Sequence, residues 1–295
     1  MKNGTIFRGI ATALVTPMDE CGVNYQDFGK FIDWQIEQGI NALVVCGTTG
    51  EAPTLTEDER KKCINLAVER SAGRVPVIAG TGCNNVAHGI EMSKFAESEG
   101  VDGLLVVTPY YNKATQSGLV NIYNEYAAAV NTPIIAYNVP GRTGVNIEPS
   151  TYAKLAEIEN IAAIKEANND IAKIVETMSY VHGKMDLYSG NDDQIVPLLG
   201  VGAKGCISVL SNILPAETVA ICDRYFEGDI DGALELQFKY FRMIKYLFCE
   251  TNPIPAKAAV SAIGFCKNYL RSPMYPMQEA NHRAMLEEMG RLGLI

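Results

Sequence analysis

Ala42-Leu43-Val44-Val45-Cys46 is a run of apolar residues, and the polar, glycine-containing loop 47–51 follows it directly. A short run that is apolar at every position indicates a strand buried on both faces, as in a parallel sheet covered by helices. Gly39 stands just before the run, where a positive φ ends a helix at little cost. The stretch therefore predicts the helix, strand and loop of a parallel α/β fold.

The same pattern recurs along the chain. Over the first six apolar runs the spacing is about thirty residues, the length of a strand, a helix and two short loops. Thr56 followed by Glu59 has the spacing of a helix capping box, and Gly73 and Gly100 each mark the end of a helical segment. The predicted strands are eight: residues 9–15, 42–46, 75–79, 103–107, 133–137, 162–165, 185–189 and 205–209. Eight such units predict a closed (β/α)8 barrel, a TIM barrel of the α/β class.

An open, doubly wound sheet is the alternative fold. It needs fewer strands and usually a G-x-G-x-x-G phosphate-binding loop, a motif that this sequence lacks. After the eighth strand we predict helices over residues 216–227, 231–248, 253–266 and 278–291. We therefore expect residues 1–228 to form the barrel and residues 229–295 to form a C-terminal helical region packed on it.

Charge and composition limit the function. The chain of 295 residues has a formal net charge of −9, which opposes attraction to nucleic acids and to anionic membranes, so a small ligand in a pocket is expected. No stretch approaches the ~18 apolar residues of a membrane span, and residues 1–4 lack the apolar core of a signal peptide, so we expect a cytoplasmic protein. The 8 cysteines form no C-x-x-C pair or Cys/His cluster; we expect buried free thiols and no metal site.

Polar residues follow the ends of the predicted strands. In a (β/α)8 barrel the reactive groups lie at the carboxyl ends of the strands, because the βα loops converge there. Hydroxyls, one arginine and one lysine are expected on this rim, in the segments 47–51, 108–112, 137–142, 165–166 and 189–192. His88, His182 and His282 are expected away from the rim, on the surface, which disfavours acid/base chemistry by histidine.

Lys165 follows the apolar residues 161–164, which would place its amine inside the barrel. Burial lowers the pKa of an ammonium and exposes a neutral amine that attacks ketones, as in Schiff-base catalysis. A solvated lysine, or one paired with Glu166, is the alternative. Proton transfers would fall to hydroxyls such as those of Thr48, Tyr111 and Tyr137, although Thr and Tyr are also ordinary strand residues.

The loop Gly47-Thr48-Thr49-Gly50-Glu51 has two interpretations. It is either a tight turn or a binding site in which backbone N–H groups and two hydroxyls converge on a small carboxylate. It lacks the Lys-Ser/Thr ending of a nucleotide-binding P-loop. We favour the carboxylate site.

Three segments carry a family resemblance: residues 47–51, 137–144 and 163–167, which read GTTGE, YNVPGRTG and AIKEA. In this order and spacing they resemble the dihydrodipicolinate synthase family of pyruvate-dependent class I aldolases, which also includes N-acetylneuraminate lyase. The resemblance covers nearly the whole chain. It implies a (β/α)8 barrel enzyme that needs neither a cofactor nor a metal, because the protonated imine is itself the electron sink.

The resemblance also implies a role for each residue around the pyruvate. Lys165 would form the imine, and Thr48 and Thr49 would hold the carboxylate of pyruvate. Tyr137 would relay protons with Thr48. Tyr111 would complete the relay from the neighbouring subunit, which implies a dimer as the minimal unit and a homotetramer made of two dimers.

The second substrate implied by the resemblance is L-aspartate 4-semialdehyde, and the product is 4-hydroxy-tetrahydrodipicolinate, in lysine and diaminopimelate biosynthesis. Arg142 would bind the carboxylate of the semialdehyde. Its planar fork suits a small carboxylate and favours the synthase over the neuraminate lyase. Gly190 and Ile207 would line the pyruvate pocket through their backbones.

Lysine-inhibited relatives have an effector site at the dimer interface, built from a Ser, two His, an Asn, a Glu and a Tyr. The corresponding positions here are Ala52, Glu57, Arg60, Asn84, His88 and Tyr110. Only Asn84 and Tyr110 agree. The comparison implies a vestigial site and weak or absent feedback inhibition by lysine.

Two other functions remain open at this point. A relative acting on N-acetylneuraminate or on a 2-keto-3-deoxy sugar acid would keep Lys165 and differ in its aldehyde partner. A non-catalytic barrel that senses a keto acid or lysine belongs to a different class. The set Thr48, Tyr111, Tyr137 and Lys165 argues against the sensor, because a sensor has no use for a proton relay.

Overall fold

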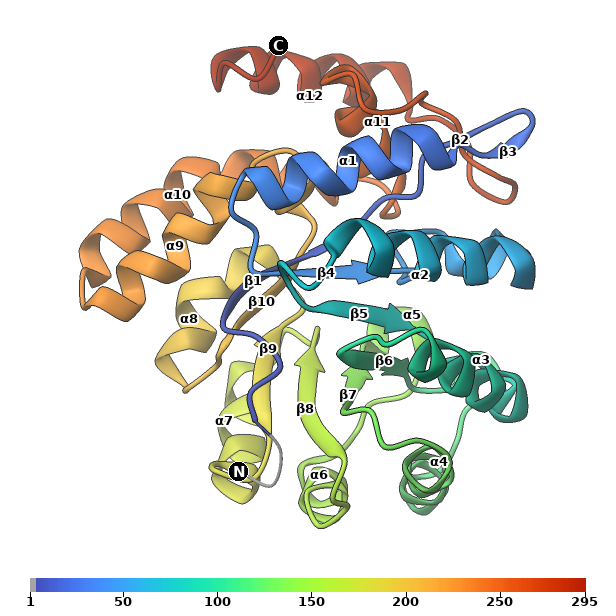
Figure 1. Ribbon diagram of the computed structural model, residues 1–295. Helices are drawn as coiled ribbons and strands as arrows, with labels where there is room; N and C mark the ends of the chain where they lie inside the picture. The colour runs from blue at the N-terminus through green and yellow to red at the C-terminus, as the bar shows by residue number, and fades with distance from the viewer. Residues whose placement is uncertain (1–3) are drawn as a thin grey trace.

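A computed structural model describes residues 4–295 (Figure 1). Residues 1–3, which carry part of the N-terminal segment expected to lack a signal peptide, lie outside the described residues. Within the described chain, parallel strands close into a barrel in the order β1-β10-β9-β8-β7-β6-β5-β4. The strands are β1 (Gly9–Ala13), β4 (Ala42–Val45), β5 (Val77–Gly80), β6 (Gly103–Val107), β7 (Ile134–Asn138), β8 (Ile161–Glu166), β9 (Asp186–Ser189) and β10 (Gly205–Ser208). The predicted closed barrel is confirmed.

Each barrel strand coincides with one predicted run to within a few residues. The sequence did not predict the small antiparallel hairpin of β2 (Met18–Asp19) and β3 (Gly22–Val23) between β1 and the first helix. Strands of two residues are too short to show a periodic pattern, which is why they escaped prediction.

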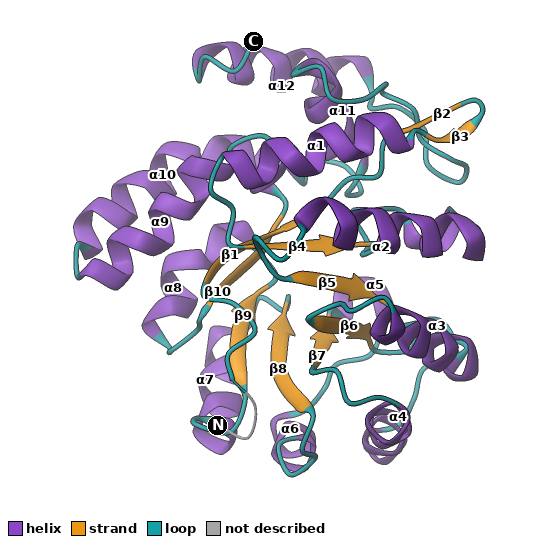
Figure 2. Cartoon of the chain, viewed as in Figure 1, coloured by secondary structure: helices purple, strands orange, loops and turns teal. Residues whose placement is uncertain are grey.

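Helices surround the barrel, as Figure 2 shows by colour. They are α1 (Tyr25–Glu37), α2 (Glu57–Ser71), α3 (Val86–Ser98), α4 (Gln116–Ala129), α5 (Pro140–Thr143), α6 (Pro149–Leu155), α7 (Ile171–Val181), α8 (Ile195–Gly200) and α9 (Pro215–Glu227), with the 3-10 turns η1 (Ala52–Thr54), η2 (Asp192–Gln194) and η3 (Leu210–Asn212). The predicted capping box at Thr56 is confirmed. Gly39, Gly73 and Gly100 have φ values of 84°, 72° and 85°, as expected of helix-ending glycines.

The core has two apolar layers because the strands are covered on both faces. On β4, Ala42 and Val44 belong to the cluster inside the barrel, whereas Leu43 and Val45 belong to the cluster between strands and helices. This alternation explains why the run is apolar at every position. The same alternation on β8 turns Ala163 inward and Ile164 outward, and so directs the next residue, Lys165, into the barrel.

The chain after the barrel is helical, in α10 (Ile230–Leu247), α11 (Ile254–Ala262) and α12 (Glu279–Arg291). The boundary proposed at residues 228/229 falls between α9 and α10. Figure 1 shows α11 and α12 on the same side of the molecule as α1. The predicted helix 253–266 is shorter in the structure, because Gly264 adopts a left-handed φ of 91° just after α11. In the described part of the chain no helix is both long enough and apolar enough to pass through a bilayer.

Candidate active site

Lys165 lies inside the barrel mouth, with 6% of its surface exposed. It is the register partner of Tyr137 on the adjacent strand β7, and its Nζ lies 4.2 Å from the centroid of the Tyr137 ring. Glu166, the next residue, points to the other face of the strand. The alternative that Lys165 is solvated or paired with Glu166 is therefore not what the structure shows.

Glu166 is held in a buried polar cluster behind the strand. Its carboxylate accepts hydrogen bonds from Asn138 Nδ2 at 2.9 and 3.1 Å, from the Tyr152 hydroxyl at 3.1 Å and from the Asn168 N–H at 3.0 Å. Burial, opposed by these hydrogen bonds, raises the pKa of Glu166 to about 7. The cluster ties the carboxyl end of β8 to β7 and thereby supports the position of Lys165.

A small enclosed cavity of about 60 Å³ lies at the end of the Lys165 side chain. It brings together most of the predicted site residues. The predicted site residues that line this cavity are Thr48, Thr49, Tyr137, Arg142, Lys165 and Gly190. Tyr111 and Ile207 are placed elsewhere: Tyr111 is 91% exposed, and Ile207 packs in the apolar layer inside the barrel.

Gly190 follows β9 and makes room for the lysine. A Cβ at this position would meet Lys165 Cε at 3.2 Å, the Glu166 carbonyl oxygen at 3.1 Å and the Ala167 Cβ at 2.7 Å. Any larger residue would therefore press on the amine-bearing chain. The geometry gives Gly190 a steric reason to lie beside Lys165.

The loop between β4 and η1 is bounded by two residues in the left-handed region, Cys46 at φ 55° and Glu51 at φ 57°. Such backbone is unfavourable for residues other than glycine and recurs at functional sites. Between them, Thr48 and Thr49 face the cavity, and Thr49 is buried. The threonine-rich loop is thus a shaped wall of the site rather than an exposed turn.

Two residues of the C-terminal helical part that belong to the site were not identified from the sequence. Asn252 lines the cavity, donates a hydrogen bond from Nδ2 to Thr49 Oγ1 at 2.9 Å, and accepts one from Arg142 through its carbonyl oxygen at 2.9 Å. Lys257 is fully buried and forms an ion pair of 2.7 Å with Glu51. No local signal identifies them, because their partners lie two hundred residues earlier in the chain.

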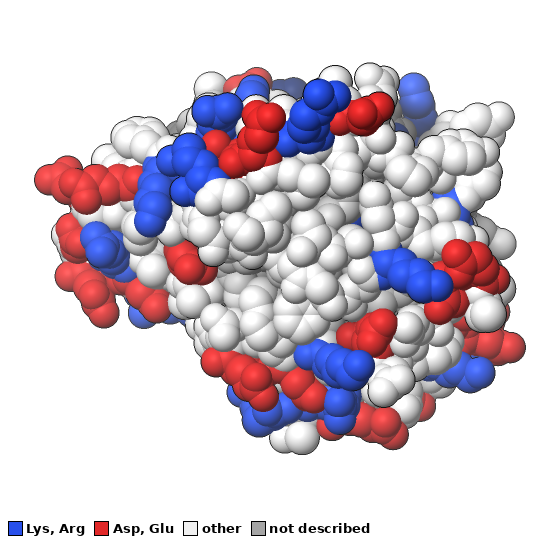
Figure 3. Space-filling view, turned by 90° about the horizontal axis from the view of Figure 1, so that it is seen from above, with Lys and Arg blue, Asp and Glu red and all other residues white. Residues whose placement is uncertain are grey.

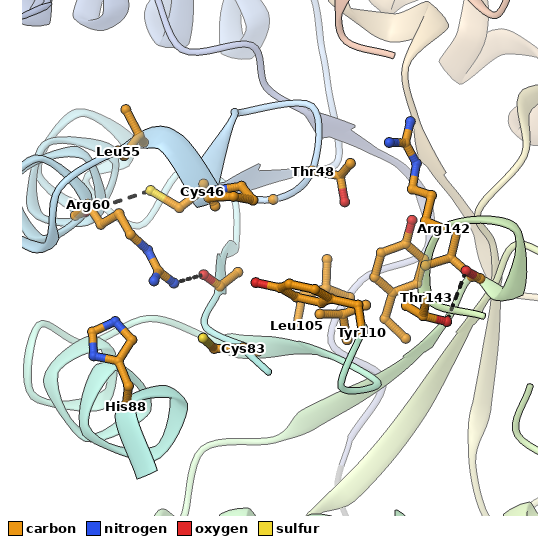
Figure 4. Close-up of a pocket in the computed structure, with 18 residues that line it drawn as sticks. Cys46, Thr48, Leu55, Arg60, Cys83, His88, Leu105, Tyr110, Arg142 and Thr143 are labelled. Atoms are coloured by element: carbon orange, nitrogen blue, oxygen red, sulfur yellow. Dashed lines mark hydrogen bonds between the residues drawn. The ribbon is translucent and has the colours of Figure 1, made fainter. Parts of the chain in front are cut away.

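A second cavity, of about 390 Å³, adjoins the site and shares Thr48, Tyr137 and Arg142 with it (Figure 4). Its wall includes four residues of the expected vestigial effector site: Ala52, Arg60, His88 and Tyr110. His88 is half-buried on α3 and lines this second cavity, whereas it does not line the small cavity beside Lys165. Figure 4 shows the Arg60 guanidinium on the same side as His88.

The two other effector positions lie outside the lining of this cavity. Glu57 forms an ion pair with Lys61 and lies 3.8 Å from His88 Nδ1, and the carbonyl oxygen of Asn84 accepts a hydrogen bond from Asn112. None of the described residues that line the cavity is Asp or Glu. A ligand with a positive charge would find the Arg60 guanidinium but no carboxylate in this wall.

The surface carries both signs of charge. On the face seen in Figure 3, Lys/Arg and Asp/Glu side chains alternate around the margin and leave the centre uncharged.

The cysteines are free, but Cys21 and Cys249 are exposed, so the expectation that all are buried is wrong. Cys21 lies in the turn between β2 and β3, and Cys249 lies in the loop after α10, which leaves both outside the core. Across residues 4–295, no group of three or more His, Cys, Asp and Glu side chains could hold a metal ion.

Comparison with known proteins agrees with the fold. The chain matches the Dihydrodipicolinate synthetase family over residues 6–289. A 4-hydroxy-tetrahydrodipicolinate synthase of Alkaliphilus oremlandii is 47% identical over 290 residues, which cover 98% of this chain and 100% of that protein. Dihydrodipicolinate synthase from Thermotoga maritima is 42% identical, with a TM-score of 0.96 over 99% of this chain and 100% of that one.

A third relative is the dihydrodipicolinate synthase of Acinetobacter baumannii, whose crystal structure is of a complex with pyruvate. It is 41% identical, with a TM-score of 0.96 over 99% of this chain and 100% of that one. Barrel, buried lysine and relatives together define a Schiff-base-forming lyase. The chain belongs to the dihydrodipicolinate synthetase family, and the resemblance inferred from the three segments is confirmed.

Proposed function

We propose that this chain condenses pyruvate with L-aspartate 4-semialdehyde to give 4-hydroxy-tetrahydrodipicolinate, a step of lysine and diaminopimelate biosynthesis. The observation that carries the proposal is the buried Lys165 at the end of a small cavity whose other walls hold Thr48, Thr49, Tyr137 and Arg142. The pyruvate complex of the Acinetobacter baumannii relative supports the first substrate.

The first half of the proposed reaction takes place on Lys165. Its unprotonated amine attacks the ketone of pyruvate and a C–N bond forms; the ketone oxygen then leaves as water, with one proton from the amine and one from the hydroxyl groups of the site, and a protonated imine remains. Loss of a methyl proton from this imine gives the enamine. Tyr137, whose ring lies beside Nζ, and Thr48 on the facing loop are the hydroxyl groups proposed to carry the protons.

In the second half, the enamine carbon attacks the aldehyde, and a C–C bond and a hydroxyl form. Arg142 is proposed to hold the carboxylate of the semialdehyde, because this residue lines both the small cavity and the larger one. The amino group of the second substrate then attacks the imine carbon and closes the ring. Lys165 leaves as the free amine, so that one water is released overall.

The choice of aldehyde partner is open to a direct test. The protein should consume pyruvate and aspartate semialdehyde together, and it should not cleave N-acetylneuraminate or a 2-keto-3-deoxy sugar acid at a comparable rate. Faster cleavage of either sugar acid would overturn the proposed substrate while leaving the Schiff-base chemistry in place. A protein that binds pyruvate without consuming either aldehyde would support the keto-acid sensor instead.

We further propose that Tyr111 acts in the site of a partner subunit, in a homotetramer made of two dimers. Tyr111 is 91% exposed and has a left-handed φ of 71°, so its ring projects from the chain. Mixing Tyr111→Phe and Lys165→Ala chains tests this proposal. A mixed dimer regains one complete site if the tyrosine acts across the interface, and regains none if it acts within its own chain.

Weak or absent inhibition by lysine is also part of the proposal. The Arg60 guanidinium in a cavity wall without carboxylates opposes binding of a cationic amino acid.

We infer a cytoplasmic location and no nucleic-acid partner from the acidic net charge of −9 and the small-molecule substrates.

A further inference from the structure

We propose that Asn252 is a positioning residue for this condensation and that it acts through the hydroxyl of Thr49; the inference rests on the function proposed above. Asn252 lies between α10 and α11 and is 6% exposed. Its Nδ2 donates to Thr49 Oγ1 at 2.9 Å, across 203 residues of sequence. Both residues line the cavity at the end of Lys165.

The direction of this hydrogen bond is the basis of the proposal. A threonine hydroxyl has one proton to donate and two positions that accept. Because the Asn252 amide donates to Thr49 Oγ1, the Thr49 proton is directed elsewhere and remains free for a ligand in the cavity. Under the proposed function that ligand group is the carboxylate of pyruvate, which accepts hydrogen bonds only.

Asn252 also contacts the residue proposed to bind the second substrate. Its carbonyl oxygen accepts a hydrogen bond of 2.9 Å from the guanidinium of Arg142, an exposed residue of the short helix α5. One residue thus orients a hydroxyl for the first carboxylate and a guanidinium for the second. The side chain of Asn252 affects only the first of these two contacts.

A buried ion pair holds Asn252 against the threonine loop. Glu51 stands two residues after Thr49, Lys257 stands five residues after Asn252, and their charged atoms are 2.7 Å apart with both side chains fully buried. Lys257 also donates to the carbonyl oxygen of Thr16. The pair therefore joins the two segments whose contact directs the Thr49 proton.

The remaining side-chain atom of Asn252 has no partner among the described residues. Its Oδ1 is buried without a hydrogen bond, which lowers stability. An apolar side chain of similar size would avoid this loss, but it would leave Thr49 without a donor. The amide is thus explained by its contact with Thr49 better than by packing.

The test compares Asn252→Ala with Asn252→Asp by trapping pyruvate on Lys165 with borohydride at increasing pyruvate concentration. Loss of one hydrogen bond in Asn252→Ala should raise the half-saturating concentration by roughly three- to ten-fold. Asn252→Asp should raise it further, although Asp matches Asn in shape, because a carboxylate takes the Thr49 proton and repels pyruvate. If Asn252 serves only packing, Asn252→Asp should raise the half-saturating concentration of pyruvate less than Asn252→Ala does. That order of the two variants would overturn the proposal.

Two further variants separate positioning from stability. In a Thr49→Val background the Asn252→Ala change should have little additional effect on trapping, whereas fully additive effects would contradict a route through Thr49. Asn160→Ala is the matched control, because Asn160 donates only to the Ala127 and Val130 carbonyls, ahead of the amino end of β8. It should lower the melting temperature and leave trapping unchanged.

The outcome for the wild-type protein distinguishes the two proposals. A wild type that traps pyruvate but does not consume aspartate semialdehyde would overturn the proposed function, while the comparison of trapping would still decide the role of Asn252. A wild type that condenses both substrates, together with Asn252 variants that trap pyruvate equally well, would overturn only the role of Asn252.

Discussion

Lys165 and Tyr137 are register partners on the neighbouring strands β8 and β7, and Nζ of Lys165 lies 4.2 Å from the centroid of the Tyr137 ring. The strand register produces this approach, because partners on adjacent parallel strands direct their side chains to the same face. On the opposite face Glu166 forms its own cluster with Asn138 and Tyr152. The reactive Lys165 and the supporting Glu166 cluster thus lie on opposite faces of β8.

Tyr137→Phe should retain the covalent adduct with pyruvate and slow the condensation. The ring that lies beside Nζ remains, whereas the hydroxyl proposed to carry protons is lost. Positioned general acid/base groups contribute about 10²–10⁴-fold to rates, so kcat should fall within that range. Steady-state kinetics and borohydride trapping check the two halves of this prediction. Loss of the adduct at saturating pyruvate would show that the hydroxyl is needed for imine formation itself.

Substitution of the two buried lysines should affect stability and activity differently. Lys257 is paired with Glu51 in the interior, so Lys257→Ala leaves an uncompensated buried charge and should cost about 3–5 kcal/mol in the free energy of unfolding. Lys165→Ala should abolish activity and cost much less stability, because it leaves no such charge behind. Urea unfolding of both variants measures the difference. Equal losses of stability would argue that Lys165 is a structural lysine.

The pKa of Glu166, raised to about 7 from its usual 4.5 by burial, has a consequence for stability. The folded chain binds this proton more tightly than the unfolded chain does. The free energy of unfolding should therefore fall as pH rises from 4.5 to about 7, with the penalty fully present above that window. Glu166→Gln cannot ionise, so the difference in stability between variant and wild type should change by on the order of 1–3 kcal/mol across the window. Parallel profiles for the two proteins, from urea unfolding at several pH values, would contradict this account.

Lysine should inhibit this protein weakly or not at all. The cavity beside the site contains the Arg60 guanidinium and lacks carboxylates among its described lining residues. Initial rates measured with increasing L-lysine should stay constant through the millimolar range, and calorimetry should detect no binding. Activity halved by sub-millimolar lysine would mean that the substituted residues form a rearranged effector site.

Most of the fold was predictable because a barrel strand covered on both faces has a distinctive apolar run. The rim position of Lys165 and the threonine loop followed from the ends of those runs. Asn252 and Lys257 were not predictable in this way, because their roles depend on contacts with Thr49 and Glu51 from the other end of the chain. The place of His88 beside the second cavity was not predictable for the same reason, since a position on a helix does not reveal which cavity that helix borders.

Covalent capture of pyruvate by Lys165 is the central claim, and mass spectrometry after borohydride reduction tests it most directly. Wild-type protein incubated with pyruvate and borohydride should gain the mass of one reduced pyruvate per chain, and peptide mapping should place it on Lys165. The Lys165→Ala variant should gain nothing under the same conditions. An unmodified wild-type chain, or an adduct located on Lys257 or on a surface lysine, would contradict the account.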